Sequence, residues 1–315
     1  MKVLVTGSSG WLGRYLMPML RAEGHEPLGL DAAPGRETHI VGSVADGRVV
    51  RDAVFAVDAV IHGAALHKPD IARYPTSAFV DTNVTGTLNL IEAAQEAGHN
   101  TFVFTSTTSV MVTEAIRAEM GDSAVWLDET TGSLAPRNIY GVTKLAAEGL
   151  CRIHARADFT ITALRTSRFF PEEDDTHRVL SGQNMKANEF LNRRLTVEDA
   201  ARAHVLALKR ERGDAFEALV ISASPPFQRS DVAALKADAA AVVLEKHPQA
   251  TDLYAERGWS LPRTIGRVYD PARAEDVLGF RARTNFAAIL TAMAEGDDLP
   301  FAHDASYASP LLSGA

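Results

Sequence analysis

An apolar, strand-like run leads directly into a glycine-rich turn near the start of the chain, and this stretch constrains the fold more than any other. It reads Val3-Leu4-Val5-Thr6-Gly7-Ser8-Ser9-Gly10-Trp11-Leu12-Gly13. Gly7 permits a tight turn, Gly10 lets backbone N–H groups approach a diphosphate, and Gly13 lets the following helix pack closely on the strand. Unpaired N–H groups and the helix dipole favour negative charge there. The stretch predicts a phosphate-binding turn, and a glycine turn that binds nothing is the alternative.

The strand expected next, residues 27–31, ends in the carboxylate of Asp31. Its distance from the glycines, about 20 residues, suits a carboxylate that accepts a hydrogen bond from a ribose 2′-hydroxyl and repels a 2′-phosphate. The two motifs together predict a dinucleotide site that takes NAD in preference to NADP. Arg36 could partly offset the repulsion if its loop folds back. A solvated strand end is the alternative interpretation of Asp31.

Strand-like and helix-like segments alternate beyond this point. We expect helices over 11–23, 49–55, 77–97 and 140–157, strands over 38–41, 59–62, 101–105 and 160–164, and then a helix over 195–208 capped by Thr196 and a strand over 218–222. This alternation predicts an α/β fold, a Rossmann-type doubly wound parallel sheet with its ligand crevice at the carboxyl ends of the strands. Gly7, Asp31, His62 and Thr105 would all lie on that edge.

The pattern breaks after residue 165, where the chain becomes too charged and irregular for a sheet. We therefore expect a dinucleotide-binding domain over 1–165, to which 195–222 returns, and a smaller C-terminal substrate-binding lobe over 166–194 and 223–315. The acidic run 172–175 is interpreted as a solvated loop, and 297–315 as a loose or docked extension.

Composition narrows the function classes. The chain has 315 residues, a formal net charge of -8 and one cysteine, Cys151. The negative charge and the lack of a basic stripe argue against nucleic acid and acidic membranes as partners. One cysteine excludes an intrachain disulfide, and the histidines lack metal-ligand spacing, so no metal is expected. The first strand begins after one lysine, which leaves no room for a signal peptide, and no apolar run is long enough to span a membrane. We expect a cytoplasmic protein.

Tyr140 and Lys144 stand four residues apart at the start of a predicted helix, so they share a face. A neighbouring ammonium should lower the pKa of a phenol and make the tyrosine a proton acceptor near neutral pH. Hydroxyl-rich residues 104–109 end the strand before this helix, at the predicted crevice, where a hydroxyl could hydrogen-bond the oxygen that Tyr140 protonates or deprotonates. A strand end followed by a turn is the alternative for those hydroxyls.

These features together resemble the extended short-chain dehydrogenase/reductase family, the NAD-dependent sugar epimerases and dehydratases. Further matching motifs are His62-Gly63-Ala64-Ala65, Asn83-Val84-Thr85-Gly86-Thr87, residues 102–110, Tyr140-Gly141-Val142-Thr143-Lys144 and Leu164-Arg165. The resemblance implies that Tyr140 is the catalytic acid/base, that Lys144 holds the nicotinamide ribose, and that Thr107 is the catalytic hydroxyl, with Ser106 as the substitute if the turn shifts by one residue.

The resemblance also implies two sets of binding residues. The cofactor set is Gly7, Ser9, Gly10, Trp11, Leu12, Gly13, Asp31, Ser43, Val44, Ala64, Ala65, Asn83, Tyr140 and Lys144. The substrate set is Ser106, Thr107, Thr108, Arg168 and Arg193. Lys186, Arg194 and Arg263 are further cations that could pair with a diphosphate or carboxylate, with solvated surface charge as the alternative.

The chain departs from the family at several places. Val110-Met111-Val112 replaces the usual valine-tyrosine-glycine, Thr108-Ser109 stands where dehydratases carry Asp-Glu, and Ser43 stands where relatives place an aspartate. Water elimination is therefore not expected. Ser167-Arg168-Phe169-Phe170 replaces an asparagine-containing segment, and the following lobe is short.

Three functions remain open. An epimerase acting on a sugar or sugar nucleotide leads, an NAD-dependent dehydrogenase of a free sugar, sugar acid or other small secondary alcohol is the alternative, and a non-catalytic dinucleotide sensor is the most remote. The family also implies a homodimer through the helices expected at 77–97 and 140–157.

Overall fold

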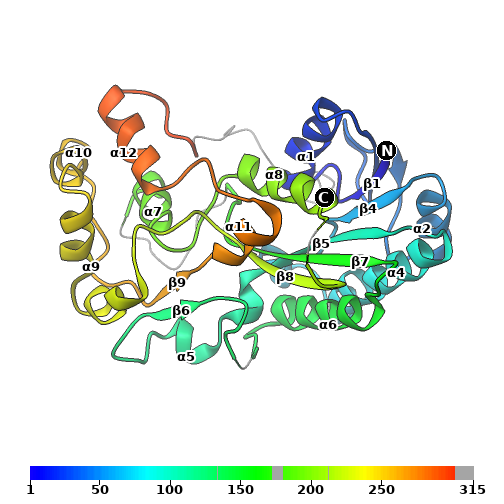
Figure 1. Cartoon of the computed structure of the whole chain (residues 1–315), viewed down its shortest axis with the longest axis horizontal. Helices are drawn as coiled ribbons and strands as arrows, with labels where there is room; N and C mark the ends of the chain where they lie inside the picture. The colour runs from blue at the N-terminus through cyan, green and yellow to red at the C-terminus, as the bar shows by residue number, and fades with distance from the viewer. Residues whose placement is uncertain (133, 172–179, 212, 302–315) are drawn as a thin grey trace.

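The sheet predicted from the sequence is confirmed. The computed structural model describes residues 1–132, 134–171, 180–211 and 213–301 (Figure 1). Seven strands form one sheet in the order β3-β2-β1-β4-β5-β7-β8, and every neighbouring pair is parallel. Their bounds are β1 (Lys2–Thr6), β2 (Glu26–Asp31), β3 (Ile40–Val41), β4 (Ala59–His62), β5 (Thr101–Thr107), β7 (Thr160–Thr166) and β8 (Phe216–Ile221).

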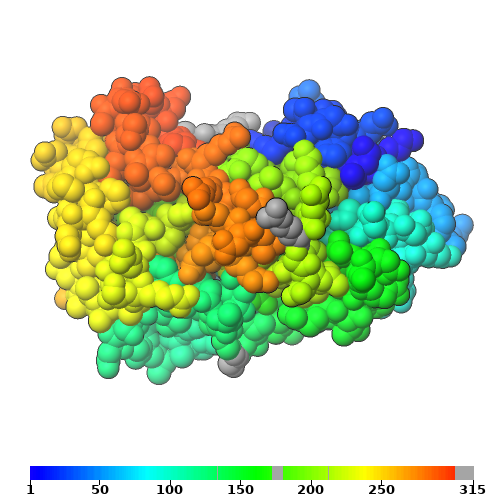
Figure 2. All heavy atoms as spheres, in the orientation of Figure 1, coloured from blue at the N-terminus to red at the C-terminus, as the bar shows by residue number. Residues whose placement is uncertain are grey.

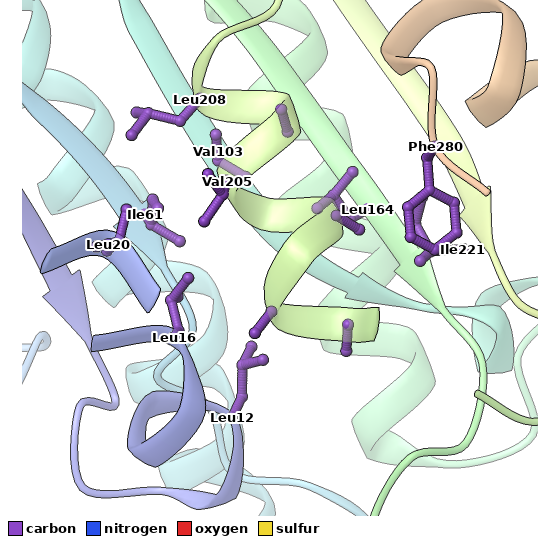
Figure 3. Close-up of a cluster of buried hydrophobic side chains, with 14 of the residues drawn as sticks. Leu12, Leu16, Leu20, Ile61, Val103, Leu164, Val205, Leu208, Ile221 and Phe280 are labelled. Atoms are coloured by element: carbon purple, nitrogen blue, oxygen red, sulfur yellow. The ribbon is translucent and has the colours of Figure 1, made fainter. Parts of the chain in front are cut away.

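Helices cover both faces of the sheet because its strands are apolar on both sides. On one face lie α1 (Trp11–Ala22) and α8 (Val197–Leu208), and on the other α2 (Gly47–Val54), α4 (Gly86–Glu96) and α6 (Ile139–His154). Successive residues of β1 show the alternation: Val3 and Val5 are buried with the first pair of helices, whereas Leu4 is buried with the second group. Figure 3 shows the first core, in which leucines of α1 face Ile61.

The crevice lies where the strand order reverses. The chain moves outward from β1 to β2 and β3, then crosses back to β4 on the other side of β1. The segments that follow β1 and β4 therefore diverge, and a ligand can enter between them at the carboxyl edge. β1 and β4 themselves stay paired to their carboxyl ends, where Gly63 N donates to Thr6 O at 3.1 Å.

The smaller lobe is built around a second core. It contains α7 (Gly182–Glu189), α9 (Val232–Lys246), α10 (Ala250–Glu256) and α12 (Phe286–Glu295), and it lies at the opposite end of the molecule from α1 (Figures 1 and 2). A two-stranded parallel sheet joins β6 (Val125–Leu127) to β9 (Arg267–Tyr269). The remaining short helices are η1 (Lys68–Ala72), α3 (Thr76–Val80), η2 (Asp81–Thr85), η3 (Thr108–Met111), α5 (Glu114–Arg117), η4 (Arg229–Asp231) and α11 (Ala272–Leu278).

Two segments differ from the domain division drawn on the sequence. β6 belongs to the range 1–165 but pairs only with β9, which belongs to the smaller lobe. Conversely, α11 lies in the range 223–315 but packs against β8 and α8 of the large sheet. A three-residue strand and a seven-residue helix are too short to give a periodic signal, which is why the sequence did not reveal these crossings. The acidic run 172–175 and residues 302–315 lie outside the described residues.

The helix expected over 77–97 is interrupted. α3 and α4 are separated by a single π-helical segment, η2. Within it the Asn83 side chain is buried and turned inward, where its Oδ1 accepts from Leu66 N at 2.9 Å and its Nδ2 donates to Leu66 O and to Thr143 Oγ1. A π segment of this kind widens the helix locally and re-aims a side chain. Asn83 thereby ties the loop after β4 to α6.

No helix among the described residues combines the length and the apolar character that crossing a membrane would require.

Candidate functional site

The glycine turn lines a cavity of about 300 Å³ at the carboxyl edge of the sheet. Gly7 has φ +72, the left-handed region, and a Cβ there would lie 2.8 Å from Ala64 N. Both facts require glycine at this position. A Cβ on Gly13 would lie 2.3 Å from Ser8 O, so the close helix–strand packing expected of that residue is present. The backbone of the turn therefore borders the cavity directly.

The carboxylate of Asp31 is held rigidly at the edge of this cavity. Its Oδ2 accepts from Ser9 N at 2.9 Å and its Oδ1 accepts from Ala33 N at 3.0 Å. Each carboxylate oxygen retains a second lone pair, so the group can still accept a hydrogen bond from a ligand hydroxyl. The Ser9 hydroxyl forms a hydrogen bond with Thr38 Oγ1, 2.5 Å long.

Most of the predicted cofactor residues line this cavity. They are Gly7, Gly10, Trp11, Leu12, Asp31, Ser43, Val44, Ala64, Ala65, Tyr140 and Lys144. Three others lie behind the lining: Ser9 supports Asp31, Gly13 permits helix packing, and Asn83 fixes Leu66. The predicted cofactor residues are therefore not all lining residues. Motif spacing predicts which loops meet at the cavity, but it does not distinguish a residue that lines the cavity from a residue that supports the lining from behind.

A second cavity of about 590 Å³ adjoins the first. Tyr140 lines both, so the phenol stands at their boundary. Asn138 caps α6 through a hydrogen bond from Gly141 N to its Oδ1, 3.0 Å long, which fixes the first turn that carries Tyr140. Thr107, at the end of β5, hydrogen-bonds the phenol. Thr107 and Thr108 line the larger cavity, whereas Ser106 lines the smaller one.

The hydroxyl of Ser106 is directed away from this pair. It donates to Glu148 Oε1 at 2.5 Å, and Glu148 in turn receives three hydrogen bonds from the Arg165 guanidinium, 2.8 to 3.2 Å long. Both charged side chains are 4% exposed. The buried pair joins α6 to β7 one turn beyond Lys144. Ser106 thus supports the helix, and Thr107 is the hydroxyl whose hydrogen bond acts on the phenol.

The expectation that Lys144 lowers the pKa of Tyr140 is wrong for this structure. Burial raises the pKa of Tyr140 to about 12, and the Asp70 carboxylate adds to the rise against the opposing hydrogen bond from Thr107. Burial lowers the pKa of Lys144 to about 7. The amine donates to Thr105 O at 2.7 Å and lies 4.5 Å from the centre of the Phe104 ring. Lys144 is thus directed at the strand, and four-residue spacing alone could not reveal this.

Cations dominate the lining of the larger cavity. The lining cations are Lys68, Arg117, Arg137, Arg168, Arg193 and Arg267, and Glu189 is the one carboxylate among the described lining residues. Glu189 contacts Arg194 at 2.6 Å, Arg193 at 3.1 Å and Arg168 at 3.7 Å. Among the described residues, one buried carboxylate is thus shared by three guanidinium groups, and cations outnumber carboxylates in the lining. The cavity therefore favours an anionic ligand.

The other predicted cations do not line this cavity. Arg194 is buried and donates to Glu189 and to Phe170 O, so it is part of the scaffold. Arg263 lines a neighbouring cavity of about 630 Å³, together with Arg193 and Arg267. Lys186 lies on α7 outside the lining of all three cavities described. The sequence position of a lysine or arginine in these charged segments did not indicate whether its side chain lines the larger cavity.

Sequence analysis missed several lining residues. His67 and Phe170 line both cavities and stack with ring centres 5.0 Å apart. Tyr269 hydrogen-bonds Thr108, and Arg267 Nε donates to the Tyr269 hydroxyl at 3.3 Å. Ser167 is buried in the larger cavity wall, and its hydroxyl has no hydrogen-bond partner in the described chain. His67 had a usable signal, because it follows the loop after β4 and precedes a carboxylate by three residues.

No group of three or more histidine, cysteine, aspartate or glutamate side chains within the described ranges is arranged to hold a metal ion.

Comparison with known proteins gives consistent results. The model of the NAD dependent epimerase/dehydratase family matches residues 3–222. A 3-beta-hydroxysteroid dehydrogenase of Mycolicibacterium neoaurum is 34% identical over 159 residues, 47% of this chain and 41% of that one. A UDP-glucose 4-epimerase of Erwinia amylovora is 30% identical over 184 residues, 52% of each chain. The chain thus spans about half the length of the curated relatives it matches.

Solved structures with a similar fold are also found. A short-chain dehydrogenase/reductase superfamily protein from Agrobacterium tumefaciens, crystallised with bound NAD, superposes with a TM-score of 0.66 at 23% identity. The match covers 94% of this chain and 96% of that one. It extends through both lobes, so the two chains share the same overall fold.

Proposed function

Because the chain belongs to the NAD dependent epimerase/dehydratase family, we propose that it is an NAD-dependent epimerase that acts on a carbinol carbon of a sugar or sugar nucleotide. The observation that carries the proposal is the position of Tyr140, which borders both the cavity of the glycine turn and the larger cavity. A proton-transferring group at that boundary can reach a substrate in one cavity while a dinucleotide occupies the other.

The residues divide the chemistry among them. NAD, when bound, supplies the hydride acceptor. Tyr140 takes the proton of the carbinol hydroxyl, and Thr107, which hydrogen-bonds the phenol, orients the carbinol oxygen. Lys144, which lines the smaller cavity, would hold the nicotinamide ribose with the N–H groups that its hydrogen bond to Thr105 O leaves over. For epimerisation, the keto sugar would turn over in the larger cavity, and Tyr140 would return the proton to its oxygen.

The smaller cavity fits NAD by its backbone. Side chains are excluded at Gly7 and Gly13, so the turn presents peptide groups to the open space. The helix behind it, α1, has no acidic residue in its first turn, and its N-cap, Gly10, has no side-chain cap. Its N-terminal N–H groups are thus available to a diphosphate.

The Asp31 carboxylate sets the preference between cofactors. We expect the protein to bind NAD more tightly than NADP because Asp31 can accept from the ribose and would repel a 2′-phosphate. Asp31→Ala should narrow that preference by roughly tenfold or more, the value of a hydrogen bond to a charged group. Titration of both cofactors into both proteins measures it, with Asp58→Ala as the control. Equal affinities in the unaltered protein would mean that Arg36 outweighs Asp31.

We expect the substrate to carry negative charge. Within the described residues, Arg168 and Arg193 both contact the Glu189 carboxylate, and the Ser167 hydroxyl in the same cavity wall has no hydrogen-bond partner. A sugar nucleotide or a sugar acid satisfies these groups better than a neutral sugar. A dehydratase is not proposed, because Thr108 and Ser109 line the cavity where that reaction needs an acid.

A dehydrogenase of a free sugar, sugar acid or other small secondary alcohol is the second candidate. Ser43 supports it, because it lines the cavity at a place where a carboxylate would help retain the cofactor, and a dehydrogenase exchanges its cofactor at every turnover. A screen of free sugars, sugar acids and sugar nucleotides separates the candidates if NADH absorbance and product stereochemistry are followed independently. Inverted product without net NADH supports the epimerase, and net NADH with a ketone or lactone supports the dehydrogenase.

We also expect a homodimer. Large apolar side chains are exposed on α3 and α6, where Val80 is 41%, Val142 48% and Ile153 74% exposed. A second copy packing helix against helix would cover these side chains. Light scattering at micromolar concentration should report the mass of two chains. The mass of one chain would contradict the proposal.

For the same site we infer that the ligand is a small molecule and not a nucleic acid, because the formal net charge of the chain is -8.

We propose that the protein acts in the cytoplasm. Its single cysteine is buried and free, which suits the reducing conditions there.

A further inference from the structure

The segment that follows β7 forms part of the wall of the larger cavity. This wall segment, Ser167-Arg168-Phe169-Phe170, begins where the strand ends, and three of its four residues line that cavity: Ser167, Arg168 and Phe170. Phe169 and Phe170 also line the smaller cavity. The contacts that hold the wall segment in place therefore determine the shape and charge of the space that we assign to the substrate.

The backbone of the wall segment is held at both of its ends. Hydrogen bonds of 2.8 to 3.3 Å tie Ser167 and Arg168 to β8 and to the segment after α7. At the other end, the Arg194 guanidinium donates to Phe170 O at 2.7 Å. Phe169 O lies between these two attachments, so its hydrogen-bond donor determines whether the wall segment is fixed along its whole length.

The donor to Phe169 O is the indole of Trp11, the first residue of α1. Trp11 Nε1 donates to Phe169 O at 3.1 Å, across 158 residues of sequence. Two strands, β4 and β5, lie between β1 and β7 in the sheet, so the contact reaches across the carboxyl edge from the glycine turn to the wall segment. Both residues are buried, with 2% and 3% exposed. Loss of the donor would thus leave a buried carbonyl without its partner, which is costly.

Aromatic contacts orient both sides of this hydrogen bond. Tyr15, one turn further along α1, packs its ring against the indole with centres 5.1 Å apart and planes 67° apart. Phe169 stacks on Phe170 with centres 4.5 Å apart, and Phe170 stacks on His67 at 5.0 Å. The hydrogen bond therefore joins an aromatic pair on the first helix to a stack of rings that borders both cavities.

We propose that Trp11 is a positioning residue for the substrate, although it lines the cofactor cavity. Its indole N–H holds Phe169 O and thereby fixes the wall segment, and with it the Arg168 guanidinium, where an anionic sugar nucleotide or sugar acid binds. The inference rests on the proposed function, because it takes the larger cavity as the substrate site. Phenylalanine at position 11 would keep an aromatic ring but could not donate this hydrogen bond.

Trp11→Phe should weaken substrate binding and leave cofactor binding nearly unchanged. With saturating NAD present, titration calorimetry with UDP-glucose and with glucuronate as anionic probes should give dissociation constants about 3- to 10-fold higher than in the unaltered protein, the value of one hydrogen bond. For any substrate that turns over, KM should rise with little change in kcat. Unchanged dissociation constants would overturn the proposal. Loss of NAD binding would also overturn it, because Trp11 would then belong to the cofactor site itself.

The matched control is Trp126→Phe. That indole also donates a hydrogen bond, from Nε1 to Asp270 Oδ2 at 2.7 Å, but it lines neither cavity. The control should leave the dissociation constants of both probes unchanged. Equal losses in the two variants would overturn the proposal, because removal of any indole hydrogen bond would then loosen the whole protein.

A double-mutant cycle tests whether Trp11 acts through the wall segment. Arg168→Ala removes the charge that this segment brings to the cavity lining. Trp11→Phe should therefore raise the dissociation constant of UDP-glucose by a smaller factor in the Arg168→Ala protein than it does alone. Equal factors in the two backgrounds would mean that Trp11 acts elsewhere and would overturn the proposal.

Hydrogen exchange followed by mass spectrometry examines the wall segment without a substrate. In the NAD-bound protein, the amides of residues 167–170 should exchange faster in Trp11→Phe than in the unaltered protein, whereas those of residues 7–13 should not change. Unchanged exchange at 167–170 would overturn the proposal. Faster exchange there, in a protein whose unaltered form binds neither UDP-glucose nor glucuronate, would support the contact made by Trp11 and count instead against the proposed function.

Discussion

Tyr140→Phe should lose at least about 100-fold in turnover, the lower end of general acid–base contributions, while NAD affinity stays nearly unchanged. The phenol borders both cavities, and its hydroxyl is the only group that the substitution removes. Steady-state turnover and NAD titration on the same preparations separate the two effects. Thr107→Ala should lose less, because Thr107 orients the oxygen without transferring the proton.

The control for this prediction is Tyr254→Phe. That phenol is buried in the smaller lobe and donates to Asn188 Oδ1 at 3.1 Å, away from the linings of both cavities. It should cost about 1 kcal/mol of stability and leave turnover unchanged. A Tyr140→Phe protein that keeps turnover within tenfold of the original would contradict the role given to Tyr140.

Arg165→Leu should lower the free energy of unfolding by about 3–5 kcal/mol, because it leaves the Glu148 carboxylate buried without its partner. Both side chains of the pair are 4% exposed, and Ser106 is the other hydrogen-bond donor to Glu148 among the described residues. Urea unfolding measures the change. Turnover should fall as well, since Glu148 lies one turn from Lys144 on α6 and fixes that helix against β7.

Two further variants sharpen this prediction. Adding Glu148→Leu to Arg165→Leu should recover much of the lost stability, because no unpaired charge remains. Arg156→Leu, in a pair with Asp158 whose side chains are 57% and 81% exposed, should change stability by less than about 1 kcal/mol. Equal costs for the buried and the exposed pair would show that burial of the charge does not determine the effect.

The sequence predicted the features that depend on local chemistry. Glycines followed by a helix, a carboxylate at the end of the next strand and alternating segments placed the sheet and the smaller cavity correctly. The N-cap at Thr196 is also confirmed, because its side chain accepts from Asp199 N. These features have short-range causes, so a single sequence contains them.

What the sequence could not show depends on contacts between distant segments. The π segment at Asn83 exists because that side chain reaches Leu66 and Thr143. The larger cavity is lined by clustered cations because Arg168 and Arg193, which lie on either side of α7 in the sequence, both contact Glu189. His67 entered the site only because the fold brings it against Phe170. The pKa of Tyr140 reflects burial, which spacing does not reveal.

The central claim is that Tyr140 serves an epimerase, which must keep its cofactor through the keto intermediate. The most direct measurement is to purify the protein by gel filtration, denature it and assay the supernatant for nicotinamide dinucleotide. We predict close to one dinucleotide per chain, retained by the glycine turn, Asp31 and Lys144. Protein that emerges without cofactor, yet reduces added NAD in the presence of a free sugar or sugar acid, would contradict the claim and identify a dehydrogenase.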